Sequence, residues 1–143
     1  NLKPMAKVID FHFHGLEPER MGLGPAYAMD GLLKRTSMKL SDMDLVEINE
    51  AFAAQLLACQ EIFDKEEVAK KYGIDTVWGK IPEDKLNVNG GAIALGHPVG
   101  STGSRLIVTL AHELKKRKGK FGIASLCIGG GQGGACIIEN LQK

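Results

Sequence analysis

Two reactive side chains in this sequence, a histidine and a cysteine, lie next to glycine-rich segments whose backbone can leave them accessible. His97 follows a glycine-rich stretch and precedes Pro98, while Cys127 directly precedes the glycine-rich residues 128–134. Proline suits the first position of a helix, so His97 is predicted to be extended at a helix mouth, where free amides favour a nearby anion and a neutral imidazole. Glycine amides after Cys127 can likewise face a ligand, which suits thiol chemistry. Both patterns indicate catalysis.

Four other residues whose side chains could take part in chemistry have simpler interpretations. Asn49 follows a short apolar run and, taken alone, is better explained as the N-cap of the next helix than as a catalytic residue. Cys59 lies on the apolar stripe of that helix and is interpreted as a core residue. His12 and His14 have a spacing that can chelate a metal, but no third ligand is evident. We therefore predict surface or interface histidines and no metal site.

Hydrophobic periodicity predicts the elements that position these residues. Alternation over 6–14, with Ile9, Phe11 and Phe13 on one face, is typical of a half-buried strand whose polar face meets solvent or a partner. Residues 15–25 are predicted to form a loop and 64–85 an exposed insertion. Helices are predicted over 26–36, from 49 or 50 to 63, around 66–72 and from 98 to 118, and further strands at 45–48, 86–89, 121–126 and 134–139.

This order of elements predicts an α/β fold, βαβαβαββ, with a mixed five-stranded sheet and helices on its faces. In open α/β sheets ligands bind beyond the carboxyl ends of the strands. Asn49, His97 and Cys127 each follow or end a predicted strand. We therefore expect these three side chains to converge at one end of the sheet.

Composition narrows the classes of function. The chain has 143 residues, enough for one domain, and its 18 Lys and Arg against 17 Asp and Glu give no broad field to attract nucleic acid or a membrane surface. Its apolar runs are shorter than a transmembrane helix requires. Three cysteines at unrelated spacings support no disulfide framework, so a reducing, cytoplasmic location is expected. Because it begins at Asn1 without a leader, we expect part of a longer polypeptide.

Three long motifs resemble the C-terminal signatures of the thiolases. They are NEAFAAQ at 49–55, NGGAIALGHPVGSTGSR at 89–105 and CIGGGQGGA at 127–135. KPMAKV at 3–8 and RMGLGPAYA at 20–28 resemble the start of the same domain. Several motifs agreeing in order are far more specific than one. The resemblance covers residues 1–143 and implies a thiolase C-terminal domain.

This resemblance implies acyl transfer through a cysteine-bound acyl group. Two acyl-CoA molecules are joined into a 3-oxoacyl-CoA, or that product is cleaved by CoA, with CoA and acyl-CoA as substrates and no cofactor. Cys127 would move the proton at the C2 carbon and at sulfur, its pKa lowered by amide dipoles, and His97 would polarise the thioester oxygen and help activate the nucleophile. Asn49 would hold a water, the Gly129 amide would stabilise the tetrahedral oxyanion, and Phe52 and Met21 would line the pantetheine and acyl pocket.

The resemblance also implies a partner. Thiolases carry the acyl-accepting cysteine and most of the CoA-binding loop domain in an N-terminal part that this sequence does not contain. The 143-residue chain alone is therefore expected to be inactive, and to work with an N-terminal half in a homodimer or homotetramer.

Three other functions are considered. A decarboxylating ketoacyl-synthase half would resemble thiolases but carry a histidine in place of Asn49 or an asparagine in place of His97, without the Cys127 motif. A nucleotide-binding module is opposed by the absence of GxxxxGK[ST] and GxGxxG. A non-catalytic assembly domain, whose exposed sheet pairs with a partner, remains an alternative.

Overall fold

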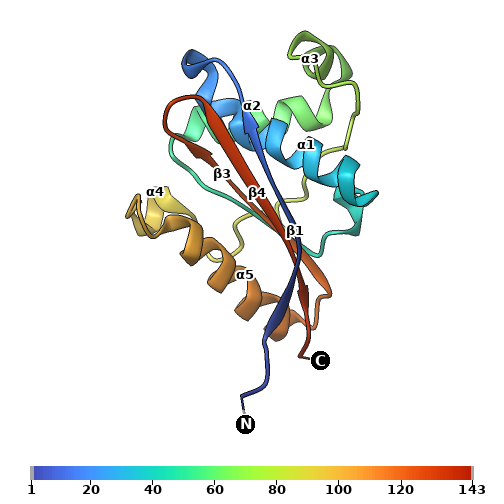
Figure 1. Cartoon of the computed structure of the whole chain (residues 1–143), viewed down its shortest axis with the longest axis vertical. Helices are drawn as coiled ribbons and strands as arrows, with labels where there is room; N and C mark the ends of the chain where they lie inside the picture. Colours follow the sequence, from blue (N-terminus) through green and yellow to red (C-terminus); the bar gives the residue numbers. More distant parts are fainter. Residues whose placement is uncertain (1, 143) are drawn as a thin grey trace.

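A mixed sheet with strand order β1-β4-β3-β2 forms the centre of the computed structural model, which describes residues 2–142 (Figure 1). The strands in these residues are β1 (Ala6–Gly15), β2 (Leu45–Ile48), β3 (Phe121–Ile128) and β4 (Gln132–Asn140). β4 is antiparallel to both β1 and β3, and β2 is parallel to β3. The α/β class is therefore confirmed.

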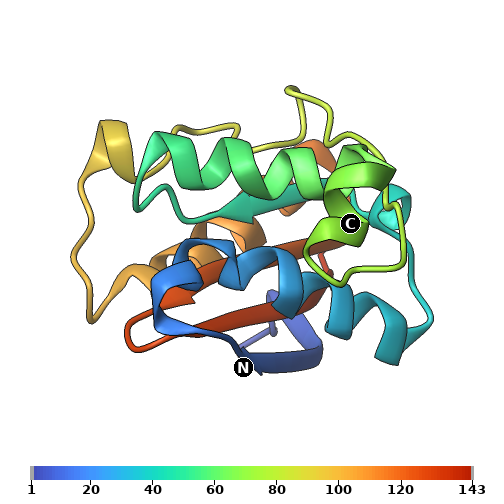
Figure 2. The ribbon, with the colours of Figure 1, turned by 90° about the horizontal axis from the view of Figure 1, so that it is seen from above.

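Helices cover the two faces of the sheet unequally. One face packs against α1 (Gly24–Thr36), α2 (Ala53–Asp64) and α3 (Glu66–Lys71), and Figure 2 shows α1 and α2 side by side. The other face packs against α5 (Thr102–Arg117), which lies across the strands from α1 in Figure 1. Short helical segments are η1 (Pro18–Leu23), η2 (Leu40–Asp42) and α4 (Ala92–Leu95).

Two apolar clusters hold these layers together. On the α1 side, Leu32 and Phe63 are fully buried with Ile123 of β3. On the α5 side, Leu110 and Leu114 pack against the sheet. Fully burying an aliphatic or aromatic side chain contributes about 1.5–3 kcal/mol, so both clusters fix the strand ends that carry the functional residues.

The predicted fifth strand, at 86–89, does not form. Leu86 makes a single bridge to Val46, and Asn87 leaves the extended conformation with a φ of 45°. Its side chain replaces the missing strand: Asn87 Oδ1 accepts from Ile48 N and Asn87 Nδ2 donates to Ile48 O, both at 2.9 Å. The five-strand prediction is therefore wrong, because a side-chain amide satisfies this edge of β2.

Ile9 packs against the core on the α1 side as predicted, but after a register shift between Val8 and Asp10 the faces of β1 are used in the opposite way to the prediction. His12 lies against Gly31 of α1, and the His14 ring stacks on Tyr27 with centroids 5.0 Å apart. Phe11 and Phe13, predicted on the buried face, are 55% and 61% exposed. The histidine face is thus packed inside this domain, and the apolar face is bare.

Other boundaries also differ from the predictions. α2 begins at Ala53, so Asn49 is not its N-cap, and α5 begins at Thr102, four residues after Pro98. The predicted loop at 15–25 contains η1, and the predicted exposed insertion at 64–85 buries Ala69, Ile74 and Ile81. Within residues 2–142, no helix is long and apolar enough to cross a membrane.

Candidate active site

Asn49 is held at the carboxyl end of β2. Its backbone N–H donates to Ser125 O at 2.9 Å, which continues the parallel pairing of β2 with β3 by one residue. The side chain is 1% exposed, and its Nδ2 lies 3.4 Å from His97 Nε2. Its Oδ1 is buried without a hydrogen-bond partner in the described chain. Asn49 therefore reaches the histidine from a rigid strand end.

His97 lies on a turn between α4 and α5. Pro98 O accepts from Ser101 N at 2.7 Å and from Thr102 N at 3.0 Å, so a turn, rather than the predicted helix mouth, follows the histidine. Arg105 Nη1 donates to Gly96 O at 2.8 Å and ties this turn to α5. The His97 side chain is exposed, which leaves it accessible to a ligand.

Cys127 and Gly129 lie where the β3–β4 hairpin turns. Cys127 pairs with Gly133 in the antiparallel register, and Gly129 follows the last residue of β3. A Cβ on Gly133 would be 2.0 Å from Gly24 O, so only glycine lets this hairpin end approach the start of α1 so closely. The close approach fixes the position of the thiol.

One cleft of about 340 Å³ brings the predicted residues together. His97, Cys127 and Gly129 line it, as do Met21 of η1 and Phe52, whose side chain is exposed rather than on the buried stripe of α2. Asn49 lies directly behind His97. Five of the six site residues predicted from the sequence therefore line a single cleft, and the sixth, Asn49, contacts His97 from behind it.

The thiol of Cys127 differs electrostatically from the expectation. Burial raises the pKa of Cys127 above the ordinary thiol value, and only its own backbone amide acts in the opposite direction. The expected lowering by the following glycine amides is therefore wrong for this chain, because half-burial removes water from the thiolate and no cation compensates among the described residues. The thiol is protonated at neutral pH.

Comparison with known proteins identifies the family. Residues 2–140 match the family model described as "Thiolase, C-terminal domain". The chain belongs to the thiolase family. In the crystal structure of the Bacillus anthracis acetyl-CoA acetyltransferase, 44% identical, the same fold recurs with a TM-score of 0.83 over 98% of this chain and 32% of that one.

Curated relatives agree with this assignment. The thiolase domain is 49% identical over 140 residues to the mitochondrial 3-ketoacyl-CoA thiolase of Bos taurus, covering 98% of this chain and 31% of that protein. It is also 49% identical to the acetyl-CoA acetyltransferase of Syntrophomonas wolfei, covering 98% and 32%. The human mitochondrial 3-ketoacyl-CoA thiolase in complex with CoA superposes with a TM-score of 0.79 at 45% identity, over 96% and 31%. The thiolase domain thus spans about a third of the length of these relatives.

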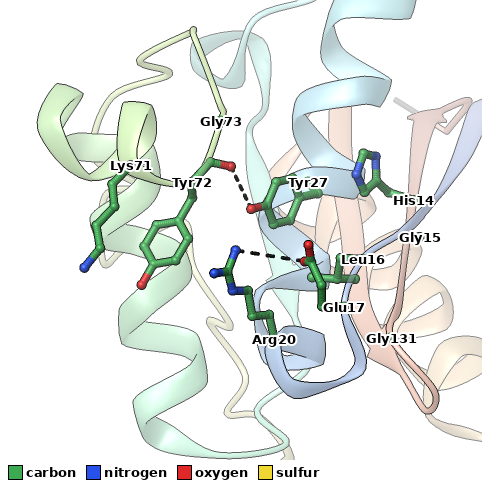
Figure 3. A pocket seen from close by; sticks show the side chains of 10 residues that line it. All are labelled: His14, Gly15, Leu16, Glu17, Arg20, Tyr27, Lys71, Tyr72, Gly73 and Gly131. Carbon is green, nitrogen blue, oxygen red and sulfur yellow. Dashed lines mark hydrogen bonds and ion pairs between the residues drawn. The ribbon is translucent and has the colours of Figure 1, made fainter.

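A larger hollow, of about 700 Å³, lies beside this cleft in the thiolase domain (Figure 3). Its lining includes Arg20, Tyr27 and Tyr72, with His14 at its edge, and no cysteine is among the lining residues. Tyr27 Oη donates to Tyr72 O at 2.7 Å, which joins α1 to the end of α3. For metals, no group of three or more His, Cys, Asp or Glu within 2–142 is placed to hold an ion.

Two residues of the site, Thr102 and Glu50, were not predicted from the sequence. Thr102 was predicted only as part of the helix from 98 to 118, yet its Oγ1 lies 2.7 Å from His97 Nδ1. Glu50 accepts from Asn87 Nδ2 at 3.0 Å and from Ile93 N at 3.1 Å, so it joins the Asn49 loop to α4. Its position next to Asn49 was the available signal, but the partners of a carboxylate cannot be deduced from spacing.

Proposed function

We propose that this thiolase domain belongs to an acyl-CoA C-acyltransferase that condenses two acetyl-CoA molecules or cleaves a 3-oxoacyl-CoA with CoA. The observation that carries this proposal is the single cleft shared by His97, Cys127 and Gly129. Relatives named acetyl-CoA acetyltransferase and 3-ketoacyl-CoA thiolase support both directions of the reaction. CoA and acyl-CoA are substrates here, and we propose no cofactor.

Cys127 is proposed as the acid and base of the reaction. A thiol with a raised pKa is protonated at rest, and the thiolate that it forms is a stronger base toward the weakly acidic C2 hydrogen. Removal of that hydrogen gives an enolate, whose oxygen needs hydrogen-bond donors to stabilise the developing charge. His97 and a water held by Asn49 are proposed to supply those donors.

The Gly129 amide is proposed to stabilise the second oxyanion. The enolate carbon attacks the acyl thioester, a tetrahedral oxyanion forms, and the carbon–sulfur bond then breaks to release the thiolate of the acyl-accepting cysteine. Gly129 follows β3 and lines the cleft beside Cys127, in a glycine-rich turn that leaves backbone groups accessible. Met21 and Phe52, on the same cleft, are proposed to contact the pantetheine and acyl chain.

The acyl-accepting cysteine is proposed to come from an N-terminal half outside this sequence. Cys59 is fully buried, and burial raises the pKa of its thiol to about 11, which makes it a poor nucleophile. Cys136 lies on a different hollow, lined by Phe11 and Phe13. The 143-residue chain alone is therefore expected to show no thiolysis.

The bare apolar face of β1 is proposed as the docking surface for that half. Phe11 and Phe13 line an apolar groove of about 180 Å³ beside α5. Exposed apolar patches of this kind mark contacts with other polypeptide segments. The relatives are about three times as long as this chain, so they contain enough polypeptide to cover the groove.

We also propose a homodimer or homotetramer, a role in fatty acid metabolism and a reducing, cytoplasmic location. Three free cysteines support the reducing location. Relatives named as mitochondrial make an organelle the alternative. Light scattering of the assembled enzyme and fractionation of the source cells test these statements.

The activity is tested with this chain joined to the N-terminal two-thirds of the enzyme. We expect thiolysis of a 3-oxoacyl-CoA and a loss of at least about 100-fold after Cys127→Ser, because general acid–base catalysis typically contributes 10²–10⁴-fold. Cys136→Ser, which changes a half-buried thiol in the adjacent strand, is the matched control and should retain activity. Full activity of the Cys127→Ser enzyme would support an assembly domain instead.

A further inference from the structure

We propose that Thr102 is a positioning residue that holds His97 in the tautomer with its proton on Nδ1. Nε2 then faces the cleft without a proton. This inference rests on the proposed function, because it assigns His97 a resting state in which it can accept the proton of the acyl-accepting thiol. Three hydrogen bonds, which link Asn49, His97, Thr102 and Pro98, are satisfied together by this assignment of protons.

The Thr102 hydroxyl determines the first half of this assignment. Thr102 is 0% exposed, and its Oγ1 donates to Pro98 O at 3.2 Å. A hydroxyl has one hydrogen, so in this arrangement Oγ1 can only accept from the second neighbour, His97 Nδ1, at 2.7 Å. Nδ1 therefore carries the proton.

Asn49 determines the state of the second ring nitrogen, His97 Nε2. Its Nδ2 lies 3.4 Å from His97 Nε2, and a side-chain NH₂ group can only donate. In a neutral imidazole one nitrogen donates and the other accepts, so Nδ1–H leaves the lone pair on Nε2 for the Asn49 amide. Asn49, His97, Thr102 and Pro98 thus form one chain of donors and acceptors without conflict.

The fold makes Thr102 a rigid support for an exposed ring. His97 lies on a turn and is exposed, whereas Thr102 is the first residue of α5, a helix of 16 residues packed on the sheet. The hydrogen bond from the ring to this hydroxyl therefore restricts the orientation of the imidazole relative to α5. A ring without this support can rotate about its side-chain bonds and populate both tautomers.

The chemical consequence concerns one proton transfer. When the nucleophile is activated, the proton of the acyl-accepting thiol moves from sulfur to His97 Nε2, giving a thiolate and an imidazolium whose Nδ1–H stays on Thr102. The new Nε2–H can then donate to the thioester oxygen. The opposite tautomer carries a proton on Nε2 from the start and cannot accept another there, so the nucleophile would not be activated.

The test uses the joined enzyme with three substitutions in α5. Thr102→Val keeps the shape and removes the hydroxyl, Thr102→Ser keeps the hydroxyl, and Thr109→Val is the same change elsewhere in the helix. We expect Thr102→Val to lower kcat for thiolysis about 10- to 100-fold, with KM within about twofold. Thr102→Ser should restore most of the activity, and Thr109→Val should leave it unchanged.

A spectroscopic measurement decides the tautomer independently of activity. ¹⁵N spectra of histidine-labelled enzyme, assigned by the signals lost in His97→Ala, should show Nδ1 protonated and Nε2 unprotonated, and a mixture after Thr102→Val. A proton on Nε2 in the unmodified enzyme, or full activity of Thr102→Val, would overturn the inference. If Thr102→Val does not fold, the spectrum of the unmodified enzyme decides alone. An inactive but correctly protonated enzyme would refute the proposed function and not this inference.

Discussion

Two hollows are lined by different residues of the same two segments, η1 and the β3–β4 turn, and they differ in chemistry. The smaller cleft is lined by Met21 of η1 and Gly129 of the β3–β4 turn, and the larger hollow by Arg20 and Gly131 of the same segments. The smaller one, at about 340 Å³, contains an exposed histidine and a half-buried thiol. The larger one, at about 700 Å³, contains neither an accessible thiol nor a residue of the three motifs other than Gly131.

Polar groups that line the larger hollow contact other residues of the domain. Tyr27 donates to Tyr72 O, the His14 ring stacks on Tyr27, and Arg20 lies 4.0 Å from Glu17 (Figure 3). In the cleft, by contrast, Cys127 and Gly129 keep groups that can face a ligand. The reactive groups that converge in the cleft, and not its volume, therefore distinguish the candidate active site from the larger hollow.

Replacing one histidine of each hollow by alanine gives the largest expected difference in activity. His97→Ala should lower thiolysis by the joined enzyme about 10²–10⁴-fold, the usual contribution of a general acid–base group. His14→Ala, in the larger hollow, removes a ring that stacks inside the domain and should change activity less than about threefold. Steady-state kinetics of the two variants measure the contrast, and equal losses would contradict it.

A second prediction concerns the proposed docking of the N-terminal half onto β1. Phe13→Asp places a charge on the bare face of β1 and should weaken binding of the N-terminal half by about tenfold or more. Leu57→Asp, which alters an equally exposed apolar residue on α2, is the control. Titration of the N-terminal half against each variant measures the affinity, and unchanged binding by Phe13→Asp would refute the docking surface.

The pH dependence of the cleft thiol gives the third prediction. Because burial raises the pKa of Cys127, its thiolate fraction, and therefore its alkylation rate, should rise about tenfold per pH unit up to a midpoint above that of a free thiol. Stability should change in the opposite direction: a raised folded pKa favours the fold at low pH and loses that contribution as pH rises through it. Peptide mass spectrometry after iodoacetamide pulses measures the midpoint, and a midpoint at or below that of a free thiol would contradict the raised pKa.

The smallest expected effect belongs to the larger hollow. Tyr27→Phe removes the hydrogen bond to Tyr72 O and should lower the free energy of unfolding by about 1 kcal/mol, a typical value for a partly buried bond. Activity of the joined enzyme should not change. Urea denaturation measures the first quantity and thiolysis kinetics the second, and a large loss of activity with no loss of stability would assign this hollow a direct role.

Local patterns predicted much of the fold. Helical spacing predicted α1 and α3 closely, and apolar runs predicted β2 and β3, because these segments bury a face whose period is visible in the sequence. The prediction of a strand at 86–89 was wrong, because the hydrogen bonds between Asn87 and Ile48 are tertiary contacts that a local sequence pattern does not reveal. The prediction for the faces of β1 failed at residues 11–14, because His12 and His14 pack against α1 and Phe11 and Phe13 are exposed, a tertiary arrangement that alternation alone does not determine.

The sequence predicted most residues of the candidate site, but not the hydrogen bonds between them. Strand ends and glycine-rich motifs brought Asn49, His97 and Cys127 to one place. Thr102 and Glu50 were missed, since each acts through a partner on another segment. The direction of the Cys127 pKa was also missed, because burial outweighs the amides and burial is known only from the packed chain.

Deuterium uptake at the C2 carbon of acetyl-CoA measures whether Cys127 moves the C2 proton in this cleft, as proposed. Acetyl-CoA is incubated in D₂O with the joined enzyme, and exchange at its C2 carbon is followed by mass spectrometry. We predict rapid exchange with the unmodified enzyme and with Cys136→Ser, and at least about 100-fold slower exchange with Cys127→Ser. Exchange by Cys127→Ser at the unmodified rate would contradict the account.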